Sequence, residues 1–409
     1  MARRETTVAG PGSRALVVDL IRSAGPISRV ELTVATGLTQ PSISNIVRKL
    51  IDDGVVRETG ATVATGGKPR SLLVINSHAI YGLGMQLGVD AITCVATDTR
   101  GGVVGRQLVE GVAGEAPELA VQRMATLCRD MMSGLGLAHE VIAGLAVVAP
   151  GPIEPSGGVV LGTPGLQLWE GFPLASALEQ ALDLPVLVDN DSAAAAVGEF
   201  WSRQVSRDDT FGSVYMGTGI GAGVVIDGAL YRGAGSNAGE LGHISIERDG
   251  IACYCGNRGC LERYAAPPAV VALARQQPDL RRELALDDIP ADARAFDEIA
   301  RAAVQGVPAA RALVEDSAEQ LADAVLTLVN LLDLNGIVLA GPGFAVAGSI
   351  YTRTIRRVLA ERAFARSAHG IVVELSSNPR DSAAIGAAAL ILQGSVAPGH
   401  GPQLSALST

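Results

Sequence analysis

The sequence is poor in charged residues, which make up only 18% of its 409 positions, whereas 48% of the positions are apolar. This balance excludes an intrinsically disordered chain, which combines high charge with low hydrophobicity. A charge-free apolar stretch covers residues 334–350 and is interrupted by Asn335, Pro342 and several glycines. We therefore expect a strand, a turn and a helix there, and not a membrane span.

The basic residues Arg3 and Arg4 are followed by no apolar run, which a secretory signal peptide requires. We therefore expect a cytoplasmic protein that does not associate with a membrane. No motif recurs at a fixed period of roughly 20–50 residues, which excludes a repeat array. The length predicts two or three domains, because a single compact core rarely grows this large.

Basic residues are outnumbered overall, with a net charge of −10, but not at the N-terminal end. Residues 1–75 contain ten Lys or Arg against six Asp or Glu, so they carry +4 and the rest of the chain carries −14. A basic head on an acidic body is typical of a DNA-binding module joined to a sensor, because phosphate contacts supply most non-specific affinity for DNA. An ordinary solvated surface is the alternative explanation.

Cysteine is scarce, with five residues in all. Cys94 and Cys128 stand alone among apolar residues, and we expect both to be buried and inert. Cys253, Cys255 and Cys260 lie within eight residues of one another. Since disulfides rarely persist in the cytosol, this cluster predicts a metal site.

The N-terminal region has the pattern of three short helices. Residues 14–23 carry their apolar side chains on one helical face. Ser28 and Glu31 have the spacing of a capping box, which predicts the start of a second helix. Gly37 fits the tight turn that ends this helix, and a third helix is expected after Thr39.

The predicted third helix has two different faces. Its apolar residues form one stripe, made of Ile43, Ile46, Val47, Leu50 and Ile51. Its start and its opposite face carry short polar and basic side chains, which suit base edges and phosphates in a major groove. The DNA-binding residues predicted in this helix are Thr39, Gln40, Ser42, Ser44, Asn45, Arg48 and Lys49.

A wing is predicted after the third helix. Residues 55–60 and 71–75 have the composition of two strands, separated by a basic, glycine-rich turn. Lys68 and Arg70 belong to this turn and are predicted to reach the DNA backbone or a minor groove. The alternative for the whole unit is a three-helix packing module with no role in DNA binding.

The rest of the chain alternates strands with helices, which predicts mixed α/β layers. Glycines punctuate the join of two strands at residues 217–223, where backbone N–H groups could approach a phosphate. Most joins of this kind are only tight turns.

A histidine completes the cysteine cluster. His243, Cys253, Cys255 and Cys260 supply the four ligands of a closed tetrahedral site, which predicts a structural Zn²⁺ with no open position for substrate. The alternative is a chance cluster of reduced cysteines.

Several motifs together resemble the ROK group of repressors and sugar kinases, and segment 239–262 is the most diagnostic of them. The other matching segments are Pro150-Gly151-Pro152, Asp189-Asn190-Asp191, Leu339-Ala340-Gly341-Pro342-Gly343 and residues 381–388. The resemblance implies an α/β fold, in which a winged helix-turn-helix precedes a two-lobed, actin-like (ribonuclease H-like) ATPase or sugar-kinase fold with a structural zinc site. It implies a DNA-binding domain over residues 1–75, a first lobe over 76–200 and a second lobe over 201–409, with the last helix packing back on the first lobe.

The resemblance also implies a sugar site. The residues that would contact sugar hydroxyls are Gly151, Asn190, Asp191, Glu240, His243 and Glu262. Carboxylates and amides suit vicinal hydroxyls because each makes several hydrogen bonds. Asp191 stands where family kinases hold their general base, although taken alone it could be a helix N-cap. No basic residue stands among these candidates, which favours a free sugar over a phosphosugar.

Residues 84–90 depart from the pattern of the family kinases, which have an acid followed by Gly-Gly-Thr. Here Gln86 replaces the acid, Val89 the second glycine and Asp90 the threonine. Gln86 lacks the charge that helps to hold hydrated Mg²⁺, and Asp90 brings negative charge toward phosphate. This departure predicts no kinase activity and leaves Asp191 as a degenerate general base.

The main hypothesis is a sugar-responsive transcriptional regulator, most simply a repressor that a sugar releases from its operator DNA. We expect a homodimer or a dimer of dimers on a near-palindromic operator. The alternative is an active ATP-dependent sugar kinase with a fused DNA-binding domain. The sequence does not name the sugar.

Overall fold

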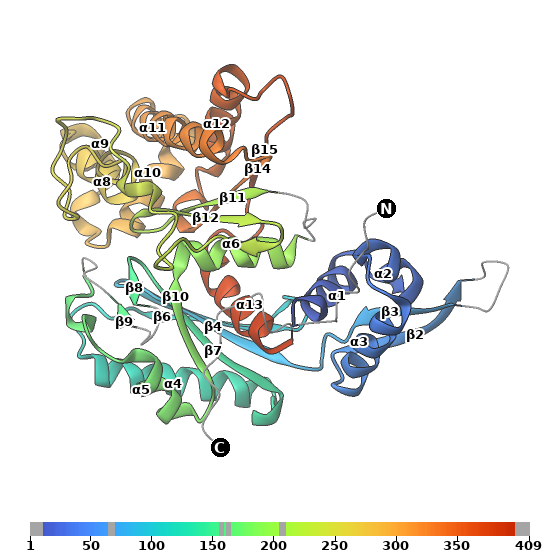
Figure 1. Cartoon of the computed structure of the whole chain (residues 1–409). Coiled ribbons are helices and arrows are strands. Elements are labelled where there is room, and N and C mark those ends of the chain that lie inside the picture. The colour runs from blue at the N-terminus through green and yellow to red at the C-terminus, as the bar shows by residue number, and fades with distance from the viewer. Residues whose placement is uncertain (1–10, 64–69, 155–158, 161–164, 204–209, 397–409) are drawn as a thin grey trace.

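The computed structural model describes residues 11–63, 70–154, 159–160, 165–203 and 210–396. A small N-terminal module lies beside two larger α/β lobes, one above the other in the view of Figure 1. No helix in these ranges is long and apolar enough to cross a membrane.

The N-terminal module is three helices and a three-stranded sheet. Its elements are α1 (Pro11–Ala24), β1 (Ile27–Ser28), α2 (Arg29–Thr36), α3 (Gln40–Asp52), β2 (Val56–Val63) and β3 (Arg70–Ile75). The sheet order is β1-β3-β2. Ser28 and Glu31 form the expected capping box, and Gly37 ends α2 in the left-handed conformation, with φ 68°. Thr39 is the N-cap of α3, so the predicted ends of α2 and the predicted start of α3 are confirmed, whereas α1 begins at Pro11, three residues before the predicted start.

The first lobe is a mixed five-stranded sheet of order β10-β7-β4-β5-β6. Its strands are β4 (Tyr81–Leu87), β5 (Ala91–Asp98), β6 (Val103–Glu110), β7 (Ile142–Ala149) and β10 (Val186–Asn190). The helices α4 (Pro117–Gly134) and α5 (Leu174–Leu182) cover one face (Figure 1). A small ribbon of β8 (Ile153–Glu154) and β9 (Val159–Val160) follows β7.

The second lobe has a five-stranded sheet of order β13-β12-β11-β14-β15. Its strands are β11 (Phe211–Met216), β12 (Ile220–Ile226), β13 (Ala229–Leu230), β14 (Gly336–Ala340) and β15 (Val372–Leu375). Its helices are α7 (Glu262–Ala265), α8 (Pro267–Arg275), α9 (Pro278–Glu283), α10 (Asp292–Gln305), α11 (Pro308–Leu332) and α12 (Gly348–Arg362).

Two buried helices, α6 (Asp191–Ser202) and α13 (Ser382–Val396), lie between the two sheets (Figure 1). Glycines let them cross with backbones in contact, since a Cβ on Gly386 would stand 1.9 Å from the Ala194 carbonyl oxygen. On its other side α13 packs against β4, where a Cβ on Gly84 would meet the Ala384 carbonyl oxygen at 2.0 Å. The last helix therefore rests on the first lobe although its sequence follows the second.

Candidate functional site

A cavity of about 750 Å³ opens between the two lobes. The six residues predicted to contact sugar all line it: Gly151, Asn190, Asp191, Glu240, His243 and Glu262. They come from the loop after β7, the junction of β10 and α6, the short helical turn Leu241–His243 and the start of α7. The structure thus brings the six together, while their contact with a sugar stays a prediction.

Asn190 lines the cavity, and its side chain bonds to the backbone around it. It is the N-cap of α6, and its Oδ1 accepts hydrogen bonds from the backbone N–H groups of Ser192 (2.9 Å) and Ala193 (3.1 Å). Its Nδ2 donates to the Gly151 carbonyl oxygen at 3.0 Å. The cap is therefore Asn190 and not Asp191, which is the first residue of the helix. The Asn190 amide therefore bonds to backbone groups, whereas the Asp191 carboxyl group is not the cap of the helix.

Asp191 is a buried acid, with 8% of its surface exposed. Burial raises its pKa to about 7, and the nearby charges of Glu240 and Glu262 act in the same direction. The backbone N–H of Ser192 opposes this shift. Near neutral pH the group therefore exists in both forms, and it can donate or accept a hydrogen bond at a hydroxyl.

Glu240 and Glu262 line the same cavity and come from the second lobe. Burial raises the pKa of Glu240. Glu262 accepts a hydrogen bond at Oε2 from the Ile220 N–H, at 3.2 Å. Gly219 leaves room for this carboxylate, because a Cβ there would stand 2.2 Å from the same oxygen. Gly239 has φ 100°, and a Cβ on it would lie 1.8 Å from a backbone oxygen of β12. The glycines near the cavity thus serve to place acidic side chains.

Sequence reasoning missed several residues that line the same cavity, among them Tyr215, Tyr254, Arg263, Asp316 and Gln320. Asp316 and Gln320 belong to α11, and no local motif signals that this helix reaches the cavity. Arg263 corrects the expectation that no basic residue accompanies the acids, although its side chain is exposed. The sequence argument for a free sugar over a phosphosugar therefore fails.

Gln86, which stands where the family kinases hold an acid, forms a hydrogen bond to the other lobe. Gln86 on β4 donates a hydrogen bond from Nε2 to the Tyr215 hydroxyl on β11, at 2.5 Å. Tyr215 is only 2% exposed and Gln86 is half-buried, so the bond is a partly buried link between the two sheets. In the turn after β4, the carbonyl oxygens of Gly88, Val89 and Asp90 accept hydrogen bonds from the N–H groups of residues 111–113. These hydrogen bonds hold the turn against the first lobe.

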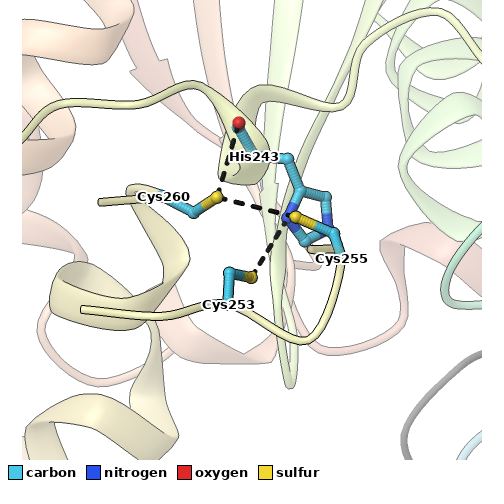
Figure 2. A group of neighbouring side chains, drawn as sticks. All are labelled: His243, Cys253, Cys255 and Cys260. Carbon is cyan, nitrogen blue, oxygen red and sulfur yellow. Dashed lines mark hydrogen bonds between the residues drawn. The ribbon is translucent and has the colours of Figure 1, made fainter. Parts of the chain in front are cut away.

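His243 and the three cysteines converge on one point (Figure 2). One ligand atom from each residue lies within 4.8 Å of the others. His243 Nδ1 lies 3.7 Å from Cys253 Sγ, and Cys255 Sγ lies 3.7 Å from Cys260 Sγ. Gly259 permits the fold of this loop, since a Cβ there would stand 1.7 Å from a backbone oxygen. The cluster can therefore hold a metal ion.

The donor set fits zinc. Zn–S bonds of about 2.3 Å place two sulfurs roughly 3.8 Å apart across a tetrahedron, close to the separation of Cys255 and Cys260. The pKa of Cys255 is lowered, chiefly because the Asn257 backbone N–H donates to its sulfur, which favours the metal-binding thiolate. On the other edge of the ring, His243 Nε2 lies 3.2 Å from the Tyr254 hydroxyl. His243 can thus present one nitrogen to a metal and the other to the cavity.

The start and outer face of α3 carry the residues predicted to contact DNA. Thr39, Gln40, Asn45, Arg48 and Lys49 are exposed, and Ser42, Ser44 and Arg70 are half-buried. In the described part of the module the ion pairs involve Arg14, Arg22 and Arg29. Arg48 and Lys49 are therefore available to phosphates. Lys68 lies outside the described residues.

The model of the ROK family matches residues 82–394, which contain the cavity and the metal cluster. The chain belongs to the ROK family. The resemblance inferred from the motifs is thereby confirmed.

This ROK protein is similar to both repressors and kinases. It is 29% identical to the "Xylose repressor" of Caldicellulosiruptor bescii, over 93% of this chain and 95% of that protein. A crystal structure of a ROK family transcriptional regulator, described as a homologue of the E. coli MLC protein, superposes with a TM-score of 0.73 at 26% identity. It covers 95% of this chain and 97% of the other. A ROK family glucokinase from Streptomyces griseus, solved with glucose and AMPPNP, gives 0.67 at 27% identity and covers 77% of this chain and 100% of its own.

The glucokinase match confirms the mixed α/β, sugar-kinase-like architecture of this ROK protein, and the regulator match extends over the N-terminal module as well.

Proposed function

We propose that this ROK protein is a sugar-responsive transcriptional repressor, whose binding to operator DNA is relieved by a sugar in the interlobe cavity. One contrast carries the proposal. The cavity is lined by all six residues of the predicted sugar site, five of them polar, whereas Gln86 and Tyr215 bond to each other where a family kinase would hold an acid. The similarity to a repressor over 93% of the chain supports the same reading.

In this proposal the carboxyl groups of Asp191, Glu240 and Glu262 bind hydroxyl groups of the sugar. Gly151 and Asn190 lie at the ends of the first-lobe strands β7 and β10, whereas Glu240 and Glu262 belong to the second lobe, so one ligand that contacts both groups favours a closed arrangement of the lobes. A sugar can shift the equilibrium only by its difference in affinity for the two arrangements, typically about 1–3 kcal/mol. The protein would bind its operator as a homodimer or a dimer of dimers, because half-site spacing makes DNA affinity sensitive to small displacements.

We propose that the metal is one Zn²⁺ per chain, held by His243, Cys253, Cys255 and Cys260. Four protein ligands leave no open position, so the ion would stabilise the loop that carries His243 into the cavity. We place the protein in the cytoplasm, which contains the DNA and keeps such thiols reduced.

A selection and release experiment tests the main proposal. The full-length protein selects duplexes from a random-sequence pool, and the enriched duplex is then titrated with D-xylose, D-glucose and N-acetyl-D-glucosamine. Enrichment of a near-palindromic sequence that one sugar releases is the expected result. Enrichment that no sugar or sugar phosphate alters would remove the sensing role.

An active sugar kinase is the second candidate. Its support is Asp191, whose pKa of about 7 suits a general base at neutral pH. The test is ATP consumption with the same sugars and with their commercially available relatives. We expect none above the rate without sugar, because phosphoryl transfer depends on positioned metal and phosphate. Sugar-dependent ADP formation would establish the kinase instead.

A further inference from the structure

One buried helix, α6, runs from the sugar cavity to the DNA-binding module. Its first residue, Asp191, lines the cavity, and its last turn lies against the N-terminal module. Every residue from Asp191 to Trp201 is buried. A helix of 12 residues is about 18 Å long, so it spans the distance as a single element.

The helix is held along its length by α13. A Cβ on Gly198 would stand 2.9 Å from the Gly386 Cα, and a Cβ on Gly386 would overlap the α6 backbone. Two helices in backbone contact leave no room for either to bend independently. A displacement at the start of α6 therefore reaches its other end.

Arg22 of α1 meets that other end. It is 5% exposed, and its Nη1 donates hydrogen bonds to the carbonyl oxygens of Trp201 and Phe200 in the last turn of α6. Its guanidinium carbon lies 4.7 Å from the centre of the Trp201 ring and 5.3 Å from that of Phe200. A cation at helix C-terminal carbonyls and over aromatic rings is held by the helix dipole and by cation–π attraction.

The contact between Arg22 and the last turn of α6 is not one that stability alone would favour. Burial lowers the pKa of Arg22, which shows that the site disfavours the charge. Its Nε and Nη2 have no hydrogen-bond partner in the described structure, and the Asp19 carboxylate approaches Nε only to 3.9 Å. A cavity of about 370 Å³ also lies beside Arg22 and Trp201. Apolar residues that replace a buried ion pair as a whole are often neutral or stabilising, so a role of Arg22 other than stability is indicated.

The module would follow a movement of Arg22. Val17, Val18 and Ile21 of α1 share one apolar core with residues of α3, among them Val47 and Leu50. A close-packed core moves as a unit. The orientation of α3 therefore depends on where α1 is anchored.

We propose that Arg22 is the positioning residue that couples the sugar cavity to the DNA-binding module. It fastens α1 to the end of α6, so that a shift of α6 on sugar binding changes the placement of α3. This inference rests on the proposed function and names the residue through which the regulation passes.

The test compares sugar affinity with and without DNA in full-length Arg22→Met. The probe sugar is whichever of D-xylose, D-glucose and N-acetyl-D-glucosamine raises the wild-type melting temperature most, and the DNA is the selected duplex. The ratio of the two sugar dissociation constants is the coupling factor, typically about 5–150 in allosteric proteins. We expect Arg22→Met to keep each separate affinity within about threefold and to lower the factor below about two. Arg29→Met is the matched control, because Arg29 pairs with Glu58 at 2.9 Å inside the module and should keep the wild-type factor.

A spectroscopic measurement covers the case in which Arg22→Met does not fold. The chain has two tryptophans, so Trp169→Phe leaves one indole in the protein, that of Trp201, which lies beside Arg22. Saturating probe sugar should change the Trp201 emission in this otherwise intact protein. A coupling factor in folded Arg22→Met equal to that of the wild type overturns the inference, and so does a Trp201 emission that sugar leaves unchanged. A wild-type factor of one would instead refute the proposed function itself.

Discussion

Asp191 titrates in the pH range where sugar affinity is readily measured, so its role can be tested by pH alone. An ionised carboxylate accepts a short, charge-assisted hydrogen bond from a hydroxyl. With a pKa of about 7, roughly one Asp191 in eleven is ionised at pH 6 and ten in eleven at pH 8. If the ionised form binds the sugar, the dissociation constant should fall about tenfold between these pH values.

The same pKa predicts the effect on stability. The pKa in the folded protein, about 7, exceeds the ordinary value of 3.8, so the folded state binds more protons than the unfolded state between these values. The free energy of unfolding therefore falls as pH rises from about 4 through 7. The loss at pH 8 is on the order of 4 kcal/mol as an upper bound. Asp191→Asn should consequently be more stable than the wild type at pH 8 but not at pH 4.

Calorimetric titrations with the probe sugar at pH 6, 7 and 8 measure the first effect, and thermal unfolding over the same range and at pH 4 measures the second. The sugar affinity of Asp191→Asn should be weaker at pH 8 and nearly independent of pH. Asp90→Asn is the matched control, because burial also raises the pKa of Asp90 but Asp90 does not line the cavity. A wild-type pH profile that persists in Asp191→Asn would refute the assignment.

Three further predictions concern the metal, the DNA face and the interlobe bond. Metal analysis should find about one zinc per chain. Cys255→Ser should lower both the zinc content and the response to sugar, whereas the control variant Asn257→Ala in the same loop should keep both. A zinc-free wild type that responds to sugar would contradict the structural role of the metal. Asn45→Ala should weaken binding to the selected duplex by about 1–3 kcal/mol and binding to random DNA only slightly. Arg48→Ala should weaken binding to both DNAs and reduce the salt dependence of binding. Equal losses of affinity for both DNAs in Asn45→Ala would exclude base readout by Asn45. Tyr215→Phe removes the bond to Gln86 and should weaken sugar binding about two- to tenfold, as measured by calorimetry; unchanged affinity would show that the bond does not support the sugar-bound arrangement.

Features that depend on neighbouring residues could be predicted from the sequence. The capping box of Ser28 and Glu31 and the glycine turn at Gly37 appear as expected, because each is decided by hydrogen bonds within one or two helical turns. The four metal ligands also come together as expected, since they lie within one loop of 18 residues. The N-cap of α6 shows the limit of such reasoning. Asn190 and Asp191 are equally good caps by type, and only the hydrogen bonds that Asn190 Oδ1 accepts from the Ser192 and Ala193 N–H groups show which one is used.

Residue types and family motifs determined which side chains belong to the candidate sugar site, and the packing of the two lobes decided what surrounds them. The Gln86–Tyr215 bond joins residues 129 positions apart, and Arg22 reaches α6 across 178 positions. Neither contact leaves a local pattern, because it depends on how the sheets and the α6–α13 pair are stacked. Arg263 and the residues of α11 enter the cavity for the same reason. The sequence alone thus determined the types of chemistry in this protein, whereas its tertiary structure decided which of those groups meet, because close packing brings distant segments into contact.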